Sequence, residues 1–180
     1  MAALEHPVES NRAMGSSGDL DEAELVRRAQ LGSSAAFEQL VQRRGPQLYR
    51  YLVVRLRDEP DALDALQETL TAAWQGLPAL KQAAKFWPWL CGIASNKAAD
   101  AARARLRTTD REIEVEASAS GVLEIREAVA ALPEQFRQVL LLRYLLGLSE
   151  EEVAQTLGIR VGTVKSRSAR ARKALMEVWT

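Results

Sequence analysis

One stretch of the sequence, residues 132–179, restricts the possible fold more than any other. Ser149 is placed to cap a short helix, and Glu152 three residues later completes a reciprocal cap. Gly158 then provides a tight break before a second helix. Apolar residues line one side of each helix: Val153, Ala154 and Leu157 in the first, and Val164, Ala171 and Leu175 in the second. The pattern predicts two helices packed across a turn.

The second of these helices is strongly basic. Its remaining faces carry five cations: Lys165, Arg167, Arg170, Arg172 and Lys173. A basic helix that follows a short helix and a turn is typical of a helix-turn-helix, whose second helix enters a DNA major groove. Two packed helices with a solvated basic face are the alternative. The coincidence of cap, turn, apolar stripe and charge in one window favours the helix-turn-helix.

The charges of the chain are segregated, although 24 basic and 24 acidic residues leave no formal net charge. Residues 77–107 contain six Lys or Arg against one Asp, and residues 159–180 contain six against one Glu. Residues 108–127, between these blocks, contain six acidic and two basic residues. Two basic blocks around an acidic connector suggest two contacts with one polyanion, although a charge block is also compatible with a merely solvated surface.

The composition excludes several classes of protein. With 180 residues, 47% of them hydrophobic, the chain is long enough for one domain or two small ones. No apolar run is long enough to cross a bilayer and no secretory signal is visible, so we expect a cytoplasmic protein without membrane insertion. Cys91 is the only cysteine and His6 the only histidine, which excludes an internal disulfide and a zinc site of the usual Cys/His type. Because no catalytic set or phosphate-binding glycine loop is present, we expect neither an enzyme nor a cofactor.

We predict an all-α fold with two small helical domains joined by a flexible acidic linker. Residues 1–18 lack periodicity and are predicted to form a disordered tail. Residues 19–107 are predicted to form the first domain and residues 108–121 the linker. Residues 122–180 then form the second domain, which contains the helix-turn-helix. In the first domain the chain is expected to break near Gly32.

The helix predicted between Pro60 and Pro78 has two different sides. Apolar residues recur at helical spacing and are expected to face the core: Leu63, Leu66, Leu70, Ala73 and Trp74. The opposite side carries Asp61, Asp64 and Glu68, with Gln67 and Thr71 beside them. Acidic residues near a helix N-terminus often only complement the helix dipole. A docking face for a partner is the alternative, and the spacing alone does not decide between the two.

Residues 80–107 place aromatic side chains next to basic ones. Phe86, Trp87 and Trp89 stand at the start of a helix that becomes basic further along. This combination suits unstacked nucleotides, because rings hold the bases while cations hold the phosphates. An aromatic residue near a helix start is more often part of a core, and we expect Trp89 to be buried and Trp87 to be partly exposed. Cys91 is expected to be a small packed apolar residue.

Together these segments resemble the extracytoplasmic-function (ECF) sigma factors, compact two-domain initiation factors of bacterial transcription. AFEQLVQRRGPQLYRYL is similar to the start of the family's region two, and DALDALQETLTAAW to its polymerase-binding helix. FWPWLCGIASNKAADAARAR resembles the segment that binds the minus-ten promoter element. ALPEQFRQVLLLRYLLGLSEEEVAQTLGIRVGTVKSR is similar to region four, which binds the minus-thirty-five element. The resemblance covers residues 20–107 and 122–178.

The resemblance implies three sites. The largest subunit of RNA polymerase would dock on Asp61, Asp64, Gln67, Glu68 and Thr71. A loop of about residues 77–85 would accept a base flipped from the non-template strand of the minus-ten element. The residues implied around that strand are Lys81, Lys85, Trp87, Asn96, Lys97, Asp100 and Arg103. Those implied to face the minus-thirty-five duplex are Arg160, Thr163, Lys165, Ser166, Arg167 and Arg170.

Several residues depart from the family pattern. Arg160 stands where a Ser normally caps the recognition helix, a change that costs about 1 kcal/mol of helix-start stability. Ser168 replaces a usual Leu, so we expect a shallow, partly wet position or a region four that needs a partner for full order. In the docking helix, Leu63 and Leu70 replace a usual Glu and a usual aromatic residue, and both are expected to point inward.

The family implies a transcription initiation factor that binds core RNA polymerase, recognises the minus-ten and minus-thirty-five elements of promoter DNA, and promotes strand opening. An anti-sigma factor is expected as a further partner. Two alternatives are a helix-turn-helix regulator that acts without core polymerase and a degenerate interaction module that titrates a partner. Run-off transcription with core polymerase separates the three, since only a sigma factor initiates there.

Overall fold

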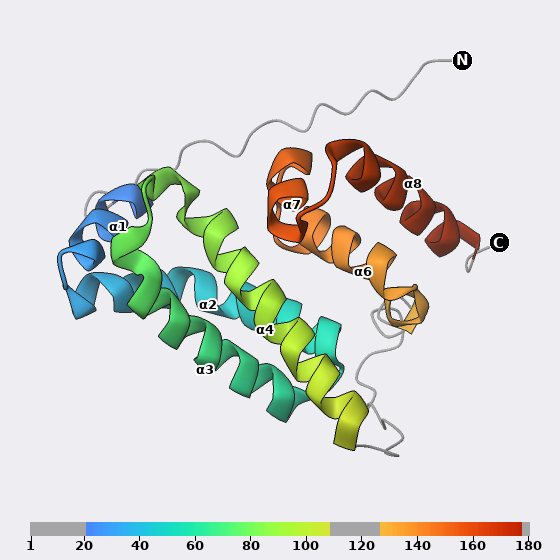
Figure 1. Ribbon diagram of the computed structural model, residues 1–180, viewed down its shortest axis with the longest axis horizontal. Helices are drawn as coiled ribbons and strands as arrows, with labels where there is room; N and C mark the ends of the chain where they lie inside the picture. The colour runs from blue at the N-terminus through green and yellow to red at the C-terminus, as the bar shows by residue number, and fades with distance from the viewer. Residues whose placement is uncertain (1–20, 109–126, 178–180) are drawn as a thin grey trace.

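The computed structural model describes residues 21–108 and 127–177, and in these two ranges every regular element is helical (Figure 1). The predicted all-α fold class is therefore confirmed. The predicted tail of residues 1–18 lies outside the described residues, as does the predicted linker apart from its first residue. No helix in the described ranges combines the length and the hydrophobicity needed to cross a membrane.

The first half of the chain is a bundle of helices. It contains α1 (Glu22–Gln30), α2 (Ser34–Leu56), α3 (Glu59–Gly76) and α4 (Phe86–Thr108). Helices α2, α3 and α4 each pack against the other two (Figure 1). Helix α1 packs against α2 and against the segment between α3 and α4. Two short 3-10 turns, Leu77–Ala79 and Ala83–Lys85, connect α3 to α4. Leu25, Leu48 and Leu52 are completely buried in the resulting core.

Local signals place the helix ends of this bundle where the sequence predicts them. Gly32 has a φ of 93°, which only glycine adopts without strain, and the Ser33 hydroxyl then caps α2. Asp58 caps α3, and Pro60 lies in its first turn, where a missing N–H costs nothing. Helix α2 runs unbroken past Pro46, which lies inside the helix.

The second half of the chain contains the predicted helix-turn-helix. Residues 127–131 are helical, and α6 (Glu134–Leu140) continues into a π-helical turn, Leu141–Leu145. Helices α7 (Glu150–Leu157) and α8 (Val161–Glu177) follow. Ser149 and Glu152 form the predicted reciprocal cap, with bonds of 3.1 and 2.9 Å, and Gly158 turns the chain with a φ of 63°.

The two halves pack against each other and share one core (Figure 1). Helix α4 packs against α7, and α2 packs against the π-helical turn. Two hydrogen bonds tie the halves together at this turn: Gln47 donates to the Leu145 carbonyl at 2.8 Å, and the Trp87 indole donates to the Leu146 carbonyl at 2.9 Å. The sequence pattern did not predict this contact, because it joins residues that no local periodicity relates.

Candidate nucleic-acid and partner interface

Helix α8 has a buried side and a basic side. Val164 and Ala171 are completely buried against the rest of the second half, as their helical spacing predicts. The opposite side points to solvent and carries the predicted minus-thirty-five residues. Arg160, Lys165, Ser166 and Arg170 are exposed, and Thr163 and Arg167 are partly buried. All six lie at or near the N-terminal half of α8, so the structure places them on one short stretch of helix.

The start of α8 is electrically suited to an anion. Arg160 stands at the residue before the helix, and its carbonyl accepts bonds from Thr163 and Val164 at 2.9 and 3.1 Å. The free N–H groups of the first turn and the helix dipole favour negative charge at this end. The long exposed Arg160 side chain adds a cation there. Lys165 is 3.7 Å from Glu150 of α7, an ion pair in which Lys165 is exposed and Glu150 partly buried.

Ser168 occupies a buried position on the inner side of α8, so the expected shallow and wet position is wrong. The residue is 5% exposed, and its hydroxyl has no hydrogen-bond partner among the described residues. Helices α6 and α7 both pack against α8, and a small side chain on the inner face allows this close approach. The departure from Leu therefore creates an unsatisfied hydroxyl rather than a surface position.

The outer face of α3 carries the predicted docking residues. Asp64, Gln67, Glu68 and Thr71 are exposed, and Asp61 is partly buried. Asp61 and Glu68 already have cationic neighbours within the protein. Arg105 lies 3.5 Å from Asp61, and Lys97 lies 3.0 Å from Glu68. Since Lys97 belongs to the predicted minus-ten set, the Glu68–Lys97 pair connects two predicted sites, and both side chains remain solvent-accessible.

The inner face of α3 differs from the expected one. Small residues face the core: Ala62, Ala65, Thr69 and Ala73. Leu63 is 48% exposed and Trp74 38% exposed, so the prediction that both point inward is wrong, whereas Leu66 and Leu70 are partly buried. Helices α2 and α4 both pack against α3, and they approach it most closely where its side chains are small. The larger Leu63 and Trp74 side chains therefore lie at the edges of this contact. These small residues recur at helical spacing in the sequence. The prediction missed this signal because it followed the more hydrophobic leucines.

The exposure of the two tryptophans at the start of α4 is the reverse of the prediction. Trp87 is 9% exposed, because the second half of the chain covers it, and Trp89 is only partly buried. The Arg44 guanidinium also stacks over the Trp87 ring at 4.7 Å from its centroid. Trp89 packs against Phe86 and close to Gly76, where an added Cβ would lie 3.1 Å from the indole.

The other predicted minus-ten residues line the loop before α4 and the outer side of that helix. Lys81, Lys85, Asn96, Asp100 and Arg103 are exposed, and Lys97 is partly buried. Asp100 and Arg103 form an ion pair one helical turn apart, and Lys85 is 3.4 Å from Glu152 of α7. The structure therefore brings the predicted minus-ten residues together on one exposed surface, with the exception of Trp87. The Trp87 side chain lies in the interface between the two halves of the chain.

Gln30 holds the loop that the resemblance implies as a base pocket, a role that helical periodicity does not predict. Its side-chain amide donates to the Leu77 carbonyl at 3.1 Å and to the Leu80 carbonyl at 2.7 Å. These bonds join the end of α1 to the segment between α3 and α4. The only local signal is a polar residue at the end of a predicted helix, which is too common to identify such a contact.

Cys91 is completely buried on α4, as predicted. Burial raises the pKa of its thiol, the Arg44 charge opposes this rise, and the Glu152 charge adds to it. Tyr51 of α2 is buried too, and burial raises the pKa of its phenol although the Arg55 charge favours the ionised form. Neither group is ionised near neutral pH, so both act as packed neutral side chains.

Comparison with known families defines the class of protein that this fold represents. Residues 26–108 match the family model described as sigma-70 region 2, and residues 123–175 match the one described as sigma-70, region 4. The first match covers the helical bundle from α1 to α4, and the second covers the helix-turn-helix. Both regions of a bacterial sigma factor are therefore present, in the order expected from the resemblance.

Individual relatives narrow the class further. The chain is 32% identical to the ECF RNA polymerase sigma factor SigM of Mycobacterium tuberculosis over 172 residues, which cover 89% of this chain and 86% of the relative. It is 35% identical to the RNA polymerase sigma factor NccH of Alcaligenes xylosoxydans xylosoxydans, covering 87% and 92% of the two chains. The solved structure of CnrH in complex with the cytosolic domain of CnrY superposes with a TM-score of 0.72 at 30% identity, covering 88% and 96%.

The chain belongs to the ECF family of RNA polymerase sigma factors. It is thus a non-catalytic transcription initiation factor, whose partners are core RNA polymerase and promoter DNA. The resemblance seen in the sequence is confirmed at the level of the family.

Proposed function

We propose that α3 is the surface through which this sigma factor binds core RNA polymerase, with Asp61, Asp64, Gln67, Glu68 and Thr71 as its contacts. The exposed acidic side chains support the proposal, because they leave a negative face free for a basic partner. Leu63 and Trp74 add exposed apolar area on the flanks of that face. Burial of these two side chains supplies affinity, while the charges supply orientation.

Region two is proposed to hold the unpaired minus-ten strand along α4 and the loop before it. Its proposed contacts are Lys81, Lys85, Asn96, Lys97, Asp100 and Arg103. Trp87 joins this set only when region four moves away from it, because the second half of the chain covers its ring in this structure. Cations beside an aromatic group bind phosphates and bases together, so capture of unstacked bases drives strand opening without ATP hydrolysis. Gln30 has a supporting role in this proposal, since it fixes the carbonyls of Leu77 and Leu80 in the loop.

Region four is proposed to place α8 in the major groove of the minus-thirty-five element, through Arg160, Thr163, Lys165, Ser166, Arg167 and Arg170. The observation that carries the proposal is the division of α8 into a buried apolar side and an exposed basic side. Phosphate contacts then supply affinity, and Arg167 is proposed to contact a base edge. We assign residues 19–107 and 122–180 to the two domains, and residues 108–121 to their linker.

The protein is proposed to work in the cytoplasm and to be controlled by an anti-sigma factor. CnrH, which is related in fold and in sequence, was solved in complex with the cytosolic domain of CnrY. The exposed acidic and apolar side chains of α3 and the exposed basic side of α8 are proposed as surfaces that a protein partner could cover. Co-purification of the tagged chain from its native cells, with mass spectrometry, tests this expectation, and recovery of core polymerase alone would contradict it.

Run-off transcription with core polymerase tests the site assignments. The unmodified chain is expected to initiate from a promoter with both elements, and replacement of Asp64 and Glu68 by Lys is expected to abolish initiation and polymerase binding while the helical content stays unchanged. Glu38→Lys, an exposed acidic residue on α2, is the matched control. Normal holoenzyme formation by the Asp64/Glu68 variant would remove the acidic face of α3 from the docking role.

A further inference from the structure

The loop of residues 77–85, between α3 and α4, carries few groups that a nucleic acid can contact. Its sequence is LPALKQAAK, so six of the nine residues have hydrocarbon side chains. The three with polar side chains are Lys81, Gln82 and Lys85, and all three are exposed. Any side-chain hydrogen bond from this loop to a phosphate or to a base edge therefore comes from these three residues.

The three side chains differ in the hydrogen bonds that they form. A lysine ammonium has three donors and no acceptor, which suits a phosphate but distinguishes bases poorly. The Gln82 amide has two donors and an acceptor oxygen. Bases differ in the pattern of donors and acceptors on their edges, and a flipped base is recognised at its Watson–Crick edge. Within the loop, Gln82 is thus the side chain that matches both kinds of group on a base.

The backbone is held in place on both sides of Gln82. After it, the Gln82 carbonyl accepts a hydrogen bond from the Lys85 N–H at 2.9 Å, in the second 3-10 turn. Before it, the Leu80 N–H donates to the Leu77 carbonyl at 3.1 Å, and Leu77 is completely buried. Only Lys81 separates Gln82 from Leu80. A side chain on a stretch that is already fixed loses less entropy when it binds a base.

Gln30, at the end of α1, ties this stretch to the helical bundle. Its side-chain amide donates to the Leu80 carbonyl at 2.7 Å and to the Leu77 carbonyl at 3.1 Å. These carbonyls lie at the two ends of the first 3-10 turn, so one side chain holds the whole turn. Helix α1 also packs against both 3-10 turns. The position of the loop therefore depends on a residue about fifty positions earlier in the chain.

We propose that Gln82 selects the base that the loop captures and that Gln30 is its positioning residue. Gln82 contacts the edge of the base, whereas Lys81 and Lys85 hold the flanking phosphates. Gln30 touches no nucleotide and acts through the Leu80 carbonyl, which sets the place from which the Gln82 side chain extends. Both roles rest on the proposed capture of the minus-ten strand by region two, and both residues lie outside the predicted minus-ten set.

Capture of a randomised single strand by the holoenzyme tests the role of Gln82. Core polymerase carrying the wild-type chain is mixed with a single-stranded DNA library, and the captured sequences are counted after subtraction of those that core polymerase captures alone. At one position the wild-type chain is expected to prefer one base about tenfold, and Gln82→Ala should reduce this preference to about twofold or less. Lys81→Ala, at the exposed neighbouring residue, is the matched control. It should lower the capture of every sequence and keep the preference.

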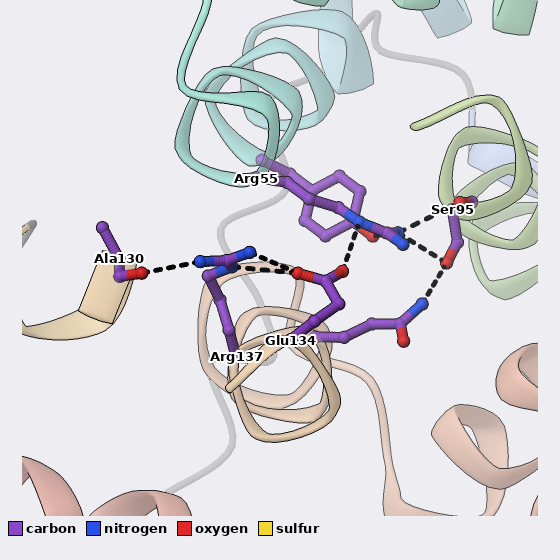
Figure 2. A network of polar contacts seen from close by, with 7 residues as sticks. Arg55, Ser95, Ala130, Glu134 and Arg137 are labelled. Carbon is purple, nitrogen blue, oxygen red and sulfur yellow. Dashed lines mark hydrogen bonds and ion pairs between the residues drawn. The ribbon is translucent and has the colours of Figure 1, made fainter. Parts of the chain in front are cut away.

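The same ratio between bases tests Gln30, because a ratio does not depend on the folded fraction of a variant. Gln30→Leu removes both amide bonds and should flatten the preference at the position that Gln82 selects. Gln30→Lys keeps donors for the two carbonyls and should restore most of the preference. Gln138→Leu is the matched control. It removes an amide bond of 3.0 Å from the polar network around Arg55, which joins α2 and α4 to region four, and should leave the preference unchanged (Figure 2).

Each outcome bears on one part of the proposal. A wild-type chain without a preference at any position, or an unchanged preference in Gln82→Ala, would overturn the role of Gln82. An unchanged preference in Gln30→Leu, or an equal loss in Gln138→Leu, would overturn the positioning role of Gln30. A wild-type chain that adds no captured sequence to those of core polymerase alone would refute the proposed capture of the minus-ten strand, and both roles with it.

Discussion

Arg55 of α2 and Glu134 of α6 form an ion pair of 3.3 Å in which the two partners are very unequally buried. The Arg55 side chain is 5% exposed and that of Glu134 is 51% exposed. Solvent weakens the attraction from the Glu134 side, so the pair alone is a modest contribution to stability. The larger contribution comes from the bonds of Arg55 to Tyr51 and Ser95, which keep the buried guanidinium satisfied.

Arg55→Ala is expected to cost more stability than Glu134→Ala. The first change leaves the Tyr51 hydroxyl and the Ser95 carbonyl without their cation and should lower the free energy of unfolding by about 2–3 kcal/mol. The second removes only the half-exposed partner and should cost about 1 kcal/mol. Urea unfolding of both single variants and the double variant measures the coupling between them. Equal losses would mean that the ion pair, not the bonds within region two, dominates.

Ser168→Ala is expected to stabilise region four. The substitution removes a buried hydroxyl that has no partner among the described residues, which should raise the free energy of unfolding by about 1 kcal/mol. Ser168→Leu, which restores the usual family residue, should instead cost about 1–3 kcal/mol because the helices already pack closely here. Thermal unfolding of both variants checks the signs, with the exposed Ser166→Ala as a control. Stabilisation by Leu would show that the site is under-filled.

Arg167→Ala is expected to weaken binding of the minus-thirty-five element by about 1–3 kcal/mol if Arg167 contacts a base edge. The loss should concentrate at one position of the element, and the other positions should keep their preferences. Binding of a set of single-base variants of the element by the holoenzyme measures this. Lys173→Ala, on the exposed C-terminal half of α8, is the matched control. An unchanged preference at every position would limit Arg167 to a phosphate contact.

Alkaline pH is expected to destabilise the fold through Cys91 and Tyr51. Burial raises the pKa of the Cys91 thiol and of the Tyr51 phenol in the folded chain above their ordinary values. Their contribution to stability is complete below the unfolded pKa values and is lost as the pH rises through the folded ones, because the unfolded chain releases these protons first. Urea midpoints should therefore fall from about pH 9 upward.

The alkaline loss can be assigned to a single group. Cys91→Ala removes one of the two titrating side chains, so the decline of the urea midpoint should be shallower in this variant and should begin near the ordinary pKa of Tyr, about 10. Iodoacetamide should also modify Cys91 slowly in the folded chain, since the thiol is buried and un-ionised. A slope unchanged by the substitution would place the effect elsewhere in the protein.

Local features of the fold could be predicted because a few neighbouring residues determine them. The Ser149–Glu152 cap and the turns at Gly32 and Gly158 follow from hydrogen bonds and backbone angles within a few residues. The basic side of α8 follows from helical spacing alone. The same reasoning failed for Leu63 and Trp74, because the distance between packed helices, not hydrophobicity, decided which side of α3 faces the core.

The sequence by itself therefore determined the all-α class, the helix-turn-helix and the family, whereas the residues of the candidate sites stay predictions. Only the tertiary structure decided that Trp87 is buried, that Ser168 is enclosed and unsatisfied, and that Arg55 meets Glu134. Each of these depends on packing between segments distant in the chain, which helical periodicity does not encode. Helical periodicity shows which residues share a face of one helix. Which other segment packs against that face depends on the shape and charge of the whole fold.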